Sequence, residues 1–186
     1  MIKNIFNTIR ELIFSPVKFW LGQKNRQQGQ WQLLGGYYFL LVIITAIAVF
    51  IGAWFNSAHF YIGFALLKSL REILLFTLLY FISIFLFNQL IPAYGGEKNL
   101  QAVRKLVVYS LTPYLLISVI SGLFPALYII NIAGLYGVYI FWIGVRVLLN
   151  IPERKQPGFI LISVLLCLFV FGILSVLLWK IFVAYY

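Results

Sequence analysis

The stretch that decides the fold is residues 106–149, LVVYSLTPYLLISVISGLFPALYIINIAGLYGVYIFWIGVRVLL, whose only charged residue is Arg146. A spanning helix needs roughly 20 apolar residues, so this stretch is too long for one span and suits two. Basic pairs precede and follow it at positions 104–105 and 154–155. Because basic residues collect on the cytoplasmic side of a membrane, the stretch predicts a helical hairpin that enters the bilayer from the inside and returns there.

The composition of the whole chain supports the same class of protein. Hydrophobic residues make up 63% of the 186 residues and charged residues 10%, too few to cover a soluble domain of this size. The net charge is +10, but the basic residues are confined to short segments between apolar runs. We interpret them as topology signals and as contacts for anionic lipid headgroups, and expect no nucleic-acid partner. The predicted fold class is an all-α polytopic membrane protein.

Residues 1–32 precede the first span and form the predicted cytoplasmic N-terminal segment. Apolar residues recur there with the period of a helix that has one apolar face, at Ile2, Ile5, Phe6, Ile9, Leu12 and Ile13. The pattern predicts a short amphipathic interfacial helix at residues 2–14. Ser15-Pro16 should end or bend it, because the residue before proline avoids helical geometry. Phe19, Trp20 and Trp31 are then predicted to anchor the segment at the membrane interface.

Residues 33–186 form the predicted membrane domain, with spans at about 33–55, 73–91, 106–123, 126–149 and 158–182. The sequence leaves open whether residues 60–72 lie on or in the membrane. With the N-terminus inside, eleven basic residues fall on the inner side and three on the outer side. This bias predicts a cytoplasmic N-terminus and an outside C-terminus, in the inner membrane of a bacterium.

Small residues predict where the spans touch, because helices in lipid associate through close packing. They occur at helical spacing in three of the expected spans, as Ala48 and Gly52, as Gly134, Gly137 and Gly144, and as Gly172 and Ser175.

Catalytic and metal-binding sets are hard to find in this chain. It has one His, one Cys and four acidic residues, all of them Glu. A catalytic triad lacks its members, and a metal site needs several nitrogen, sulfur or oxygen ligands. His59 and Cys167 fall at different depths of the predicted topology. We therefore expect no enzyme, no cofactor and no metal, and the state of Cys167 stays open.

Span three is the most polar of the five. Ser110, Tyr114, Ser118 and Ser121 recur at spacings of four, four and three, which is one helical face. Pro113 should bend the helix and free the carbonyl near Tyr109, which Tyr109, Ser110 and Thr112 are close enough to help satisfy. We consider two roles for this face, lining a cavity or lipid path and ordinary interhelical hydrogen bonding. Asn131 in span four could face the same interior.

Arg146 and the group Lys68, Arg71 and Glu72 are charged residues for which we consider more than one role. Arg146 could snorkel to lipid phosphates or pair with Glu97 or Glu153 on the same side. Lys68 and Glu72 are four residues apart and could pair along one helix face. The group then forms a solvated helix end, unless span two begins near residue 62. In that case it lies in the membrane and becomes a candidate for an ion or proton path.

Several short motifs occur in a recognisable order: Phe14-Ser15-Pro16, Phe19-Trp20, Gly95-Gly96, the run Tyr109-Ser110-Leu111-Thr112-Pro113-Tyr114, Gly144-Val145-Arg146 and Ile151-Pro152. This order resembles the Yip-domain family, polytopic proteins named for their interaction with Ypt/Rab GTPases. The resemblance covers nearly the whole chain and is closest to the bacterial branch, which lacks a long N-terminal cytosolic region. It implies five spans with a cytosolic N-terminus. In eukaryotic members it also implies a link to vesicle-mediated transport through GTPases and other family partners.

Two functional hypotheses follow from the sequence. The first is a non-enzymatic membrane protein that organises or shapes the bilayer and assembles with protein partners, either other membrane proteins or itself as a homo-oligomer. The second is a small transporter, channel or lipid-translocating protein that uses the polar face of span three. If the chain has a site, we expect it along residues 106–149.

Overall fold

The computed structural model describes residues 2–24, 26, 29–56 and 61–182. Every element that it describes is helical, and five helical segments are long and apolar enough to cross a membrane. They are Trp31–Asn56, Ile62–Tyr94, Leu100–Leu123, Pro125–Leu148 and Glu153–Phe182. The predicted all-α, five-span class with a short N-terminal helix is confirmed.

The helical elements occur in the following order: α1 (Ile2–Phe14), α2 (Pro16–Lys24), α3 (Gln30–Leu33), the π-helical η1 (Leu34–Tyr38), α4 (Phe39–Asn56), α5 (Ile62–Leu90), the 3₁₀ turn η2 (Ile91–Tyr94), α6 (Leu100–Leu123), the 3₁₀ segment η3 (Pro125–Leu135), α7 (Tyr136–Leu148), the 3₁₀ turn η4 (Glu153–Lys155) and α8 (Gln156–Phe182).

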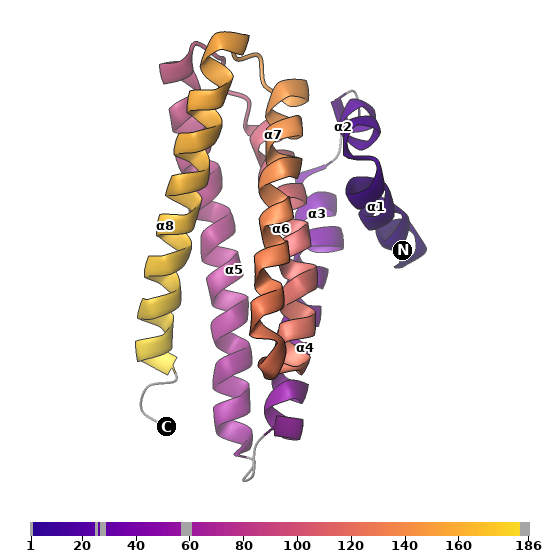
Figure 1. The fold of residues 1–186 in the computed structure, drawn as a ribbon, viewed down its shortest axis with the longest axis vertical. Helices are drawn as coiled ribbons and strands as arrows, with labels where there is room; N and C mark the ends of the chain where they lie inside the picture. Colours follow the sequence, from indigo (N-terminus) through magenta and orange to yellow (C-terminus); the bar gives the residue numbers. More distant parts are fainter. Residues whose placement is uncertain (1, 25, 27–28, 57–60, 183–186) are drawn as a thin grey trace.

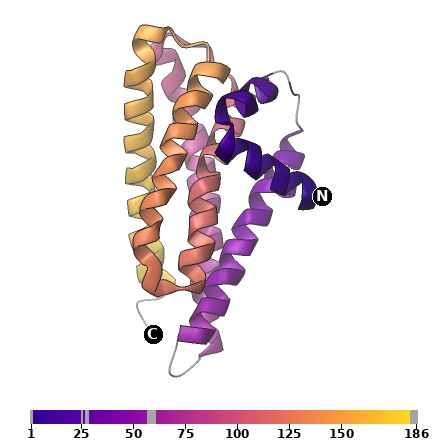
Figure 2. The ribbon, with the colours of Figure 1, turned by 45° about the vertical axis from the view of Figure 1, so that its right-hand side comes forward.

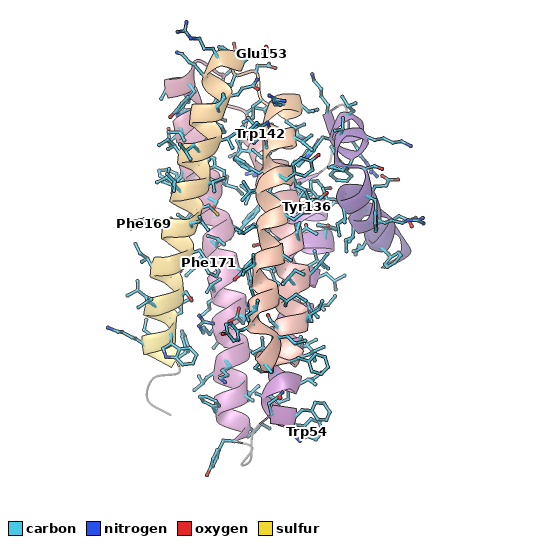
Figure 3. The ribbon with its side chains drawn as sticks, viewed as in Figure 1. Trp54, Tyr136, Trp142, Glu153, Phe169 and Phe171 are labelled. Atoms are coloured by element: carbon cyan, nitrogen blue, oxygen red, sulfur yellow. The ribbon has the colours of Figure 1, made fainter. Side chains whose placement is uncertain are left out.

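The long helices stand side by side as a bundle with α6 in its middle (Figure 1). α6 packs against α4, α5, α7 and η3, whereas α8 packs mainly against α5. One end of the bundle carries the loops at residues 95–99 and 149–152, and we call it the basic end. The other end carries the start of α5 and the end of α8, and we call it the distal end. Figure 3 shows Trp54 near the distal end and Glu153 at the basic end.

The N-terminal helices α1 and α2 lie against one side of the bundle in its basic half, and α1 runs obliquely to the long helices (Figure 2). Pro16 begins α2, a position where its missing N–H is not needed. The predicted helix at residues 2–14 coincides with α1, and Leu12 is its fully buried contact. Phe6 and Phe14 remain exposed and form an apolar surface on α1.

Phe19 and Trp20 are not interface anchors, and that prediction was wrong. Both are buried in the core, Trp20 completely, and the Trp20 indole N–H donates to the carbonyl of Ile140 at 3.0 Å. The Trp20 ring meets Phe19 and Tyr109 edge-on. An indole can be buried when its N–H finds a partner, and α7 offers one. Trp31, by contrast, is 79% exposed.

Lys105 has a structural contact that the sequence did not predict. Its side chain is buried, and its ammonium donates to the carbonyl of Gln23 at 2.7 Å and to the carbonyl of Arg26. These carbonyls lie at and just beyond the C-terminal turn of α2, where a helix leaves carbonyls without partners and favours positive charge. Lys105 therefore fastens α2 to α6.

The second long helix begins at Ile62, earlier than the expected start of span two at residue 73. The sequence left open whether residues 60–72 lie on or in the membrane. Residues 62–72 form the beginning of α5, which runs on from them without a break. His59 and residue 60 lie outside the described residues. Hydropathy alone placed the start later because Lys68, Arg71 and Glu72 interrupt the apolar run. Contacts from α8, described below, accommodate Arg71 inside the bundle, and Arg71 in turn pairs with Glu72.

Close backbone contacts hold α6 to its neighbours. A Cβ on Gly52 would lie 1.8 Å from the carbonyl oxygen of Gly122, so α4 and α6 touch there. Gly137 lies against the backbone of α6 in the same way, since a Cβ there would lie 2.3 Å from the carbonyl oxygen of Ser110. Gly172 on α8 has open space around it. The expectation of a close helix contact at Gly172 was wrong.

Candidate functional site

A cavity of about 560 Å³ lies in the distal half of the bundle, between α4, α5, α6 and α8. Small-molecule sites fall in the range of about 300–1,000 Å³. Polar and charged side chains from each of these helices, and from η3, line it: Thr45, Asn56, Lys68, Arg71, Glu72, Tyr114, Ser118, Ser121, Asn131 and Ser175. Because spans are otherwise apolar, this concentration of polar groups makes the distal cavity the strongest candidate site.

The charged side chains of the distal cavity come from one helix, α5. Arg71 Nη1 forms an ion pair with Glu72 Oε1, the only ion pair found among the described residues, and both side chains are largely buried. Arg71 Nη2 also donates to Ser175 Oγ at 2.7 Å, and the guanidinium lies 5.6 Å from the Trp179 ring centre. The expected pairing of Lys68 with Glu72 is therefore wrong. Lys68 Nζ instead lies 4.4 Å from the centre of the Phe64 ring.

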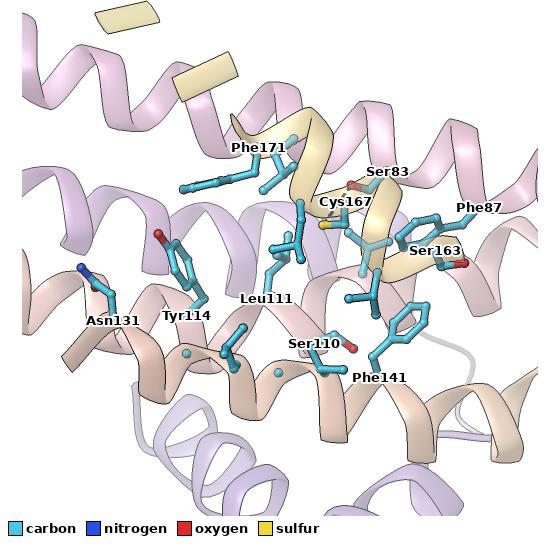
Figure 4. Close-up of a pocket in the computed structure, with 18 residues that line it drawn as sticks. Ser83, Phe87, Ser110, Leu111, Tyr114, Asn131, Phe141, Ser163, Cys167 and Phe171 are labelled. Carbon is cyan, nitrogen blue, oxygen red and sulfur yellow. Dashed lines mark hydrogen bonds between the residues drawn. The ribbon is translucent and has the colours of Figure 1, made fainter. Parts of the chain in front are cut away.

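The polar face of α6 lines this cavity and a second one. Tyr114, Ser118 and Ser121 border the distal cavity, and Ser121 Oγ donates to Asn131 Oδ1 at 3.0 Å. Asn131 therefore does face the same interior as this helix face. Ser110 borders a smaller, mostly apolar cavity of about 160 Å³ (Figure 4), and its buried hydroxyl has no hydrogen-bond partner among the residues that the structure describes.

The two cavities adjoin each other. Tyr114, Asn131 and Phe171 line both of them. In the close-up these three residues lie toward one end of the apolar cavity, and Phe141 and Ser163 lie toward the other (Figure 4). The bundle thus contains the polar distal cavity and, deeper inside, an apolar cavity.

Tyr109 and Thr112 do not face either cavity. Thr112 is fully buried, with its hydroxyl donating to the Val108 carbonyl at 3.0 Å and lying 3.1 Å from Tyr37 Oη. Tyr109 packs edge-on against Phe19 and beside Tyr37. The run Tyr109–Tyr114 is therefore divided, with Tyr109 and Thr112 toward α2 and η1 and Ser110 and Tyr114 toward the cavities.

The remaining predicted residues lie away from the distal cavity. α6 runs through Pro113 as one helix, and Pro113 is buried beside Ile13 of α1. Gly95 has φ +79°, a left-handed conformation that suits glycine, and ends η2. Gly96 is held between side chains, since a Cβ there would lie 2.9 Å from Ile151 Cγ1. Both glycines shape the loop at the basic end.

Arg146 is exposed at the basic end of α7, with its guanidinium 5.5 Å from the Trp142 ring centre. No ion pair joins it to Glu97 or Glu153, all three being among the described residues. The paired interpretation of Arg146 is therefore not supported, and the snorkelling one remains a prediction.

Sequence reasoning missed the contributions of α4 and α8 to the site. Ser175 was predicted only as a small packing residue, yet it contacts Arg71, and so does Trp179. The side-chain amide of Asn56 donates to the carbonyls of Gly52 and Leu123 at the cavity wall. The only sequence signal was that these polar and aromatic residues all occur near the distal ends of their spans.

Five helices long and apolar enough to cross a membrane define this chain as a polytopic helical membrane protein. A family model for the Yip1 domain matches residues 10–175, and the chain belongs to that family. No curated protein and no solved structure matches the chain.

Proposed function

We propose that this Yip1-domain protein is a non-enzymatic membrane protein that admits a polar or charged molecule into the distal cavity, as a small transporter or lipid-translocating protein. The observation that carries the proposal is the meeting of Arg71, Glu72 and Lys68 with the polar face of α6 around one cavity. Charged groups within spans are costly and commonly mark substrate or ion pathways.

The contacts around Arg71 support this over a purely structural role. A structural ion pair is expected to have its polar atoms satisfied by neighbouring protein groups. Here Arg71 Nε is buried without a partner, and no hydrogen bond or ion pair to Lys68 is found within the described residues. The site therefore retains donors that a bound molecule could use.

The test is transport by the purified full chain in liposomes. We expect it to accelerate the transbilayer movement of a fluorescent phospholipid, or the flux of an ion or small polar solute. Arg71→Gln should reduce that rate, whereas Lys180→Gln, which removes a charge on α8 outside the cavity lining, should not. Rates equal to those of protein-free liposomes for every probe would contradict the proposal.

A second function, shaping the bilayer, is favoured by one specific observation. Phe6 and Phe14 on α1 are 68% and 79% exposed although α1 is docked on the bundle. The Tyr136 hydroxyl donates to the carbonyl of Ile13 at 2.8 Å, which fixes the end of the helix. An amphipathic helix held in one leaflet favours curvature.

This second function is tested by the size of vesicles reconstituted with the full chain. Wild type should yield smaller or tubular vesicles, and the double variant Phe6→Ser/Phe14→Ser should yield larger ones. Trp31→Ser is the matched control, because Trp31 is equally exposed but lies outside α1. Identical size distributions for all of them would exclude shaping by α1.

We further propose the topology and partners that fit these functions. The basic end would face the cytoplasm of a bacterium and contact anionic headgroups of the inner membrane, which places the N-terminus inside and the C-terminus outside. Assembly with other membrane proteins, or of the chain with itself, is part of the same proposal. Crosslinking of the full chain in native membranes tests the assembly directly.

A further inference from the structure

The distal cavity carries an excess of positive charge. Lys68 and Arg71 contribute two cations against the single carboxylate of Glu72. The Phe64 ring is a weak partner for the Lys68 ammonium, and an aromatic face does not neutralise a charge. A cavity inside a membrane-spanning bundle with one uncompensated cation attracts an anion.

The guanidinium of Arg71 is arranged to bind an oxyanion. Glu72 occupies Nη1, and Ser175 accepts from Nη2, while the buried Nε has no partner. Nη2 already donates to the hydroxyl and the carbonyl of Ser175, so Nε is the guanidinium donor that remains for an oxygen of a phosphate. The Trp179 ring over the guanidinium keeps its plane fixed.

The depth of these groups matches the level of lipid headgroups. At about 1.5 Å per residue, Lys68, Arg71 and Glu72 lie roughly 9 to 15 Å along α5 from Ile62. The span Ile62–Tyr94 has 33 residues, so it is roughly 50 Å long and exceeds the hydrocarbon core of about 30 Å at both ends. If the span is centred on the core, the three charges lie within roughly 5 Å of its edge.

The apolar cavity supplies a place for hydrocarbon next to this charge. It is lined mainly by apolar side chains such as Leu79, Leu111 and Leu168, and its volume is about 160 Å³. An apolar cavity of about 150 Å³ is known to stay dry and bind benzene. Because Tyr114, Asn131 and Phe171 border both cavities, a molecule with a polar and an apolar part could occupy the two together.

We propose that the distal cavity binds the phosphate headgroup of an anionic phospholipid. Lys68 and Arg71 bind the phosphate oxygens, Glu72 orients Arg71, and part of an acyl chain enters the apolar cavity past Tyr114. This inference uses the same site as the proposed function, the distal cavity. It does not otherwise rest on that function, because a lipid can bind without being transported. The phosphate chemistry is common to a lipid headgroup and to free phosphate, and the apolar cavity favours the lipid.

Ligand-induced stabilisation tests the binding. The purified full chain in non-ionic detergent is titrated with dihexanoyl phosphatidylglycerol, with dihexanoyl phosphatidylcholine and with inorganic phosphate, and its melting temperature is followed. Phosphatidylglycerol should raise the melting temperature most. Equal stabilisation by inorganic phosphate would overturn the lipid assignment, and equal stabilisation by phosphatidylcholine would overturn the selectivity for an anion.

Variants locate the site. Lys68→Gln should weaken the apparent affinity for phosphatidylglycerol by about tenfold to a hundredfold, the usual effect of losing a charge-assisted hydrogen bond. Lys68→Arg should restore binding, which separates loss of charge from loss of folding. Lys180→Gln removes the same charge outside the cavity and should bind as wild type does. Unchanged affinity for Lys68→Gln would overturn the proposal.

The transport assay separates the two proposals. Phosphatidylglycerol binding that depends on Lys68, without lipid movement or solute flux, would overturn the proposed function and support this inference. Transport that Lys68→Gln leaves unchanged, without stabilisation by phosphatidylglycerol, would overturn this inference and support the proposed function.

Discussion

The two sides of α6 differ in how their polar groups are satisfied. Toward α2 and η1, the Thr112 hydroxyl has partners in both Val108 and Tyr37, within a cluster of buried aromatic rings. Toward α5 and α8, the Ser110 hydroxyl has none, and Tyr114 and Ser118 border open space. One helix therefore presents a closed aromatic side and an open cavity side.

The difference separates structure from function within one short motif. Polar groups that hold a bundle together are expected to be hydrogen-bonded, because an unsatisfied group in the bilayer is costly. The aromatic side meets that expectation and fastens α2 and η1 to α6. On the cavity side Ser121 is hydrogen-bonded to Asn131, but the Ser110 hydroxyl has no partner among the described residues, which leaves a polar group available to a ligand.

The largest expected effect is on the aromatic side. Trp20→Ala removes a fully buried ring and its hydrogen bond to the Ile140 carbonyl. We expect the free energy of unfolding in detergent to fall by about 3–5 kcal/mol. Trp31→Ala is the matched control, since Trp31 is 79% exposed, and it should change stability little. Equal effects of the two would mean that the aromatic side does not hold the bundle.

A smaller effect is expected at the wall of the distal cavity. Gly52→Ala places a Cβ against the carbonyl oxygen of Gly122. Neither atom can rotate away as the end of a flexible side chain could, so the two helices must separate. The free energy of unfolding should fall by about 1–3 kcal/mol. Gly172→Ala meets open space and should be close to neutral. A neutral Gly52→Ala would argue that α4 does not close the cavity as described.

The number of spans and the polar face of α6 could be predicted because they follow from local pattern. Apolar runs long enough for the bilayer and a spacing of three and four residues require no knowledge of the partner helices. The start of α5 at Ile62 could not be predicted. Arg71 is accommodated there by Ser175 and Trp179, and these two residues come from the far end of the chain.

The burial of Trp20 and Lys105 shows the same limit. Each is a residue type that is common at the membrane interface. Each is buried here because a backbone carbonyl distant in the sequence accepts a hydrogen bond from its side chain. The pairing of Glu72 with Arg71 in place of Lys68 likewise depends on where α8 holds the guanidinium. Tertiary partners, invisible in a single sequence, decided these residues.

The smallest energetic effect compares the two hydroxyls directly. Thr112→Val keeps the shape of the side chain but removes its hydrogen bond with Tyr37, and should cost about 1 kcal/mol. Ser110→Ala removes a hydroxyl that has no partner, so stability should stay the same or rise. Unfolding of both variants in the same detergent gives the comparison. A larger cost for Ser110→Ala would reverse the assignment of the two sides.

The most direct test of the open cavity side is the reactivity of single cysteines with a water-soluble thiol reagent. The chain has one native cysteine, Cys167, so Cys167→Ser provides a background for Ser118→Cys on the cavity side and Thr112→Cys on the aromatic side. In reconstituted full-length protein, we expect the cysteine at position 118 to react and the one at position 112 to stay protected. Equal reactivity at the two positions, or protection at both, would contradict the account.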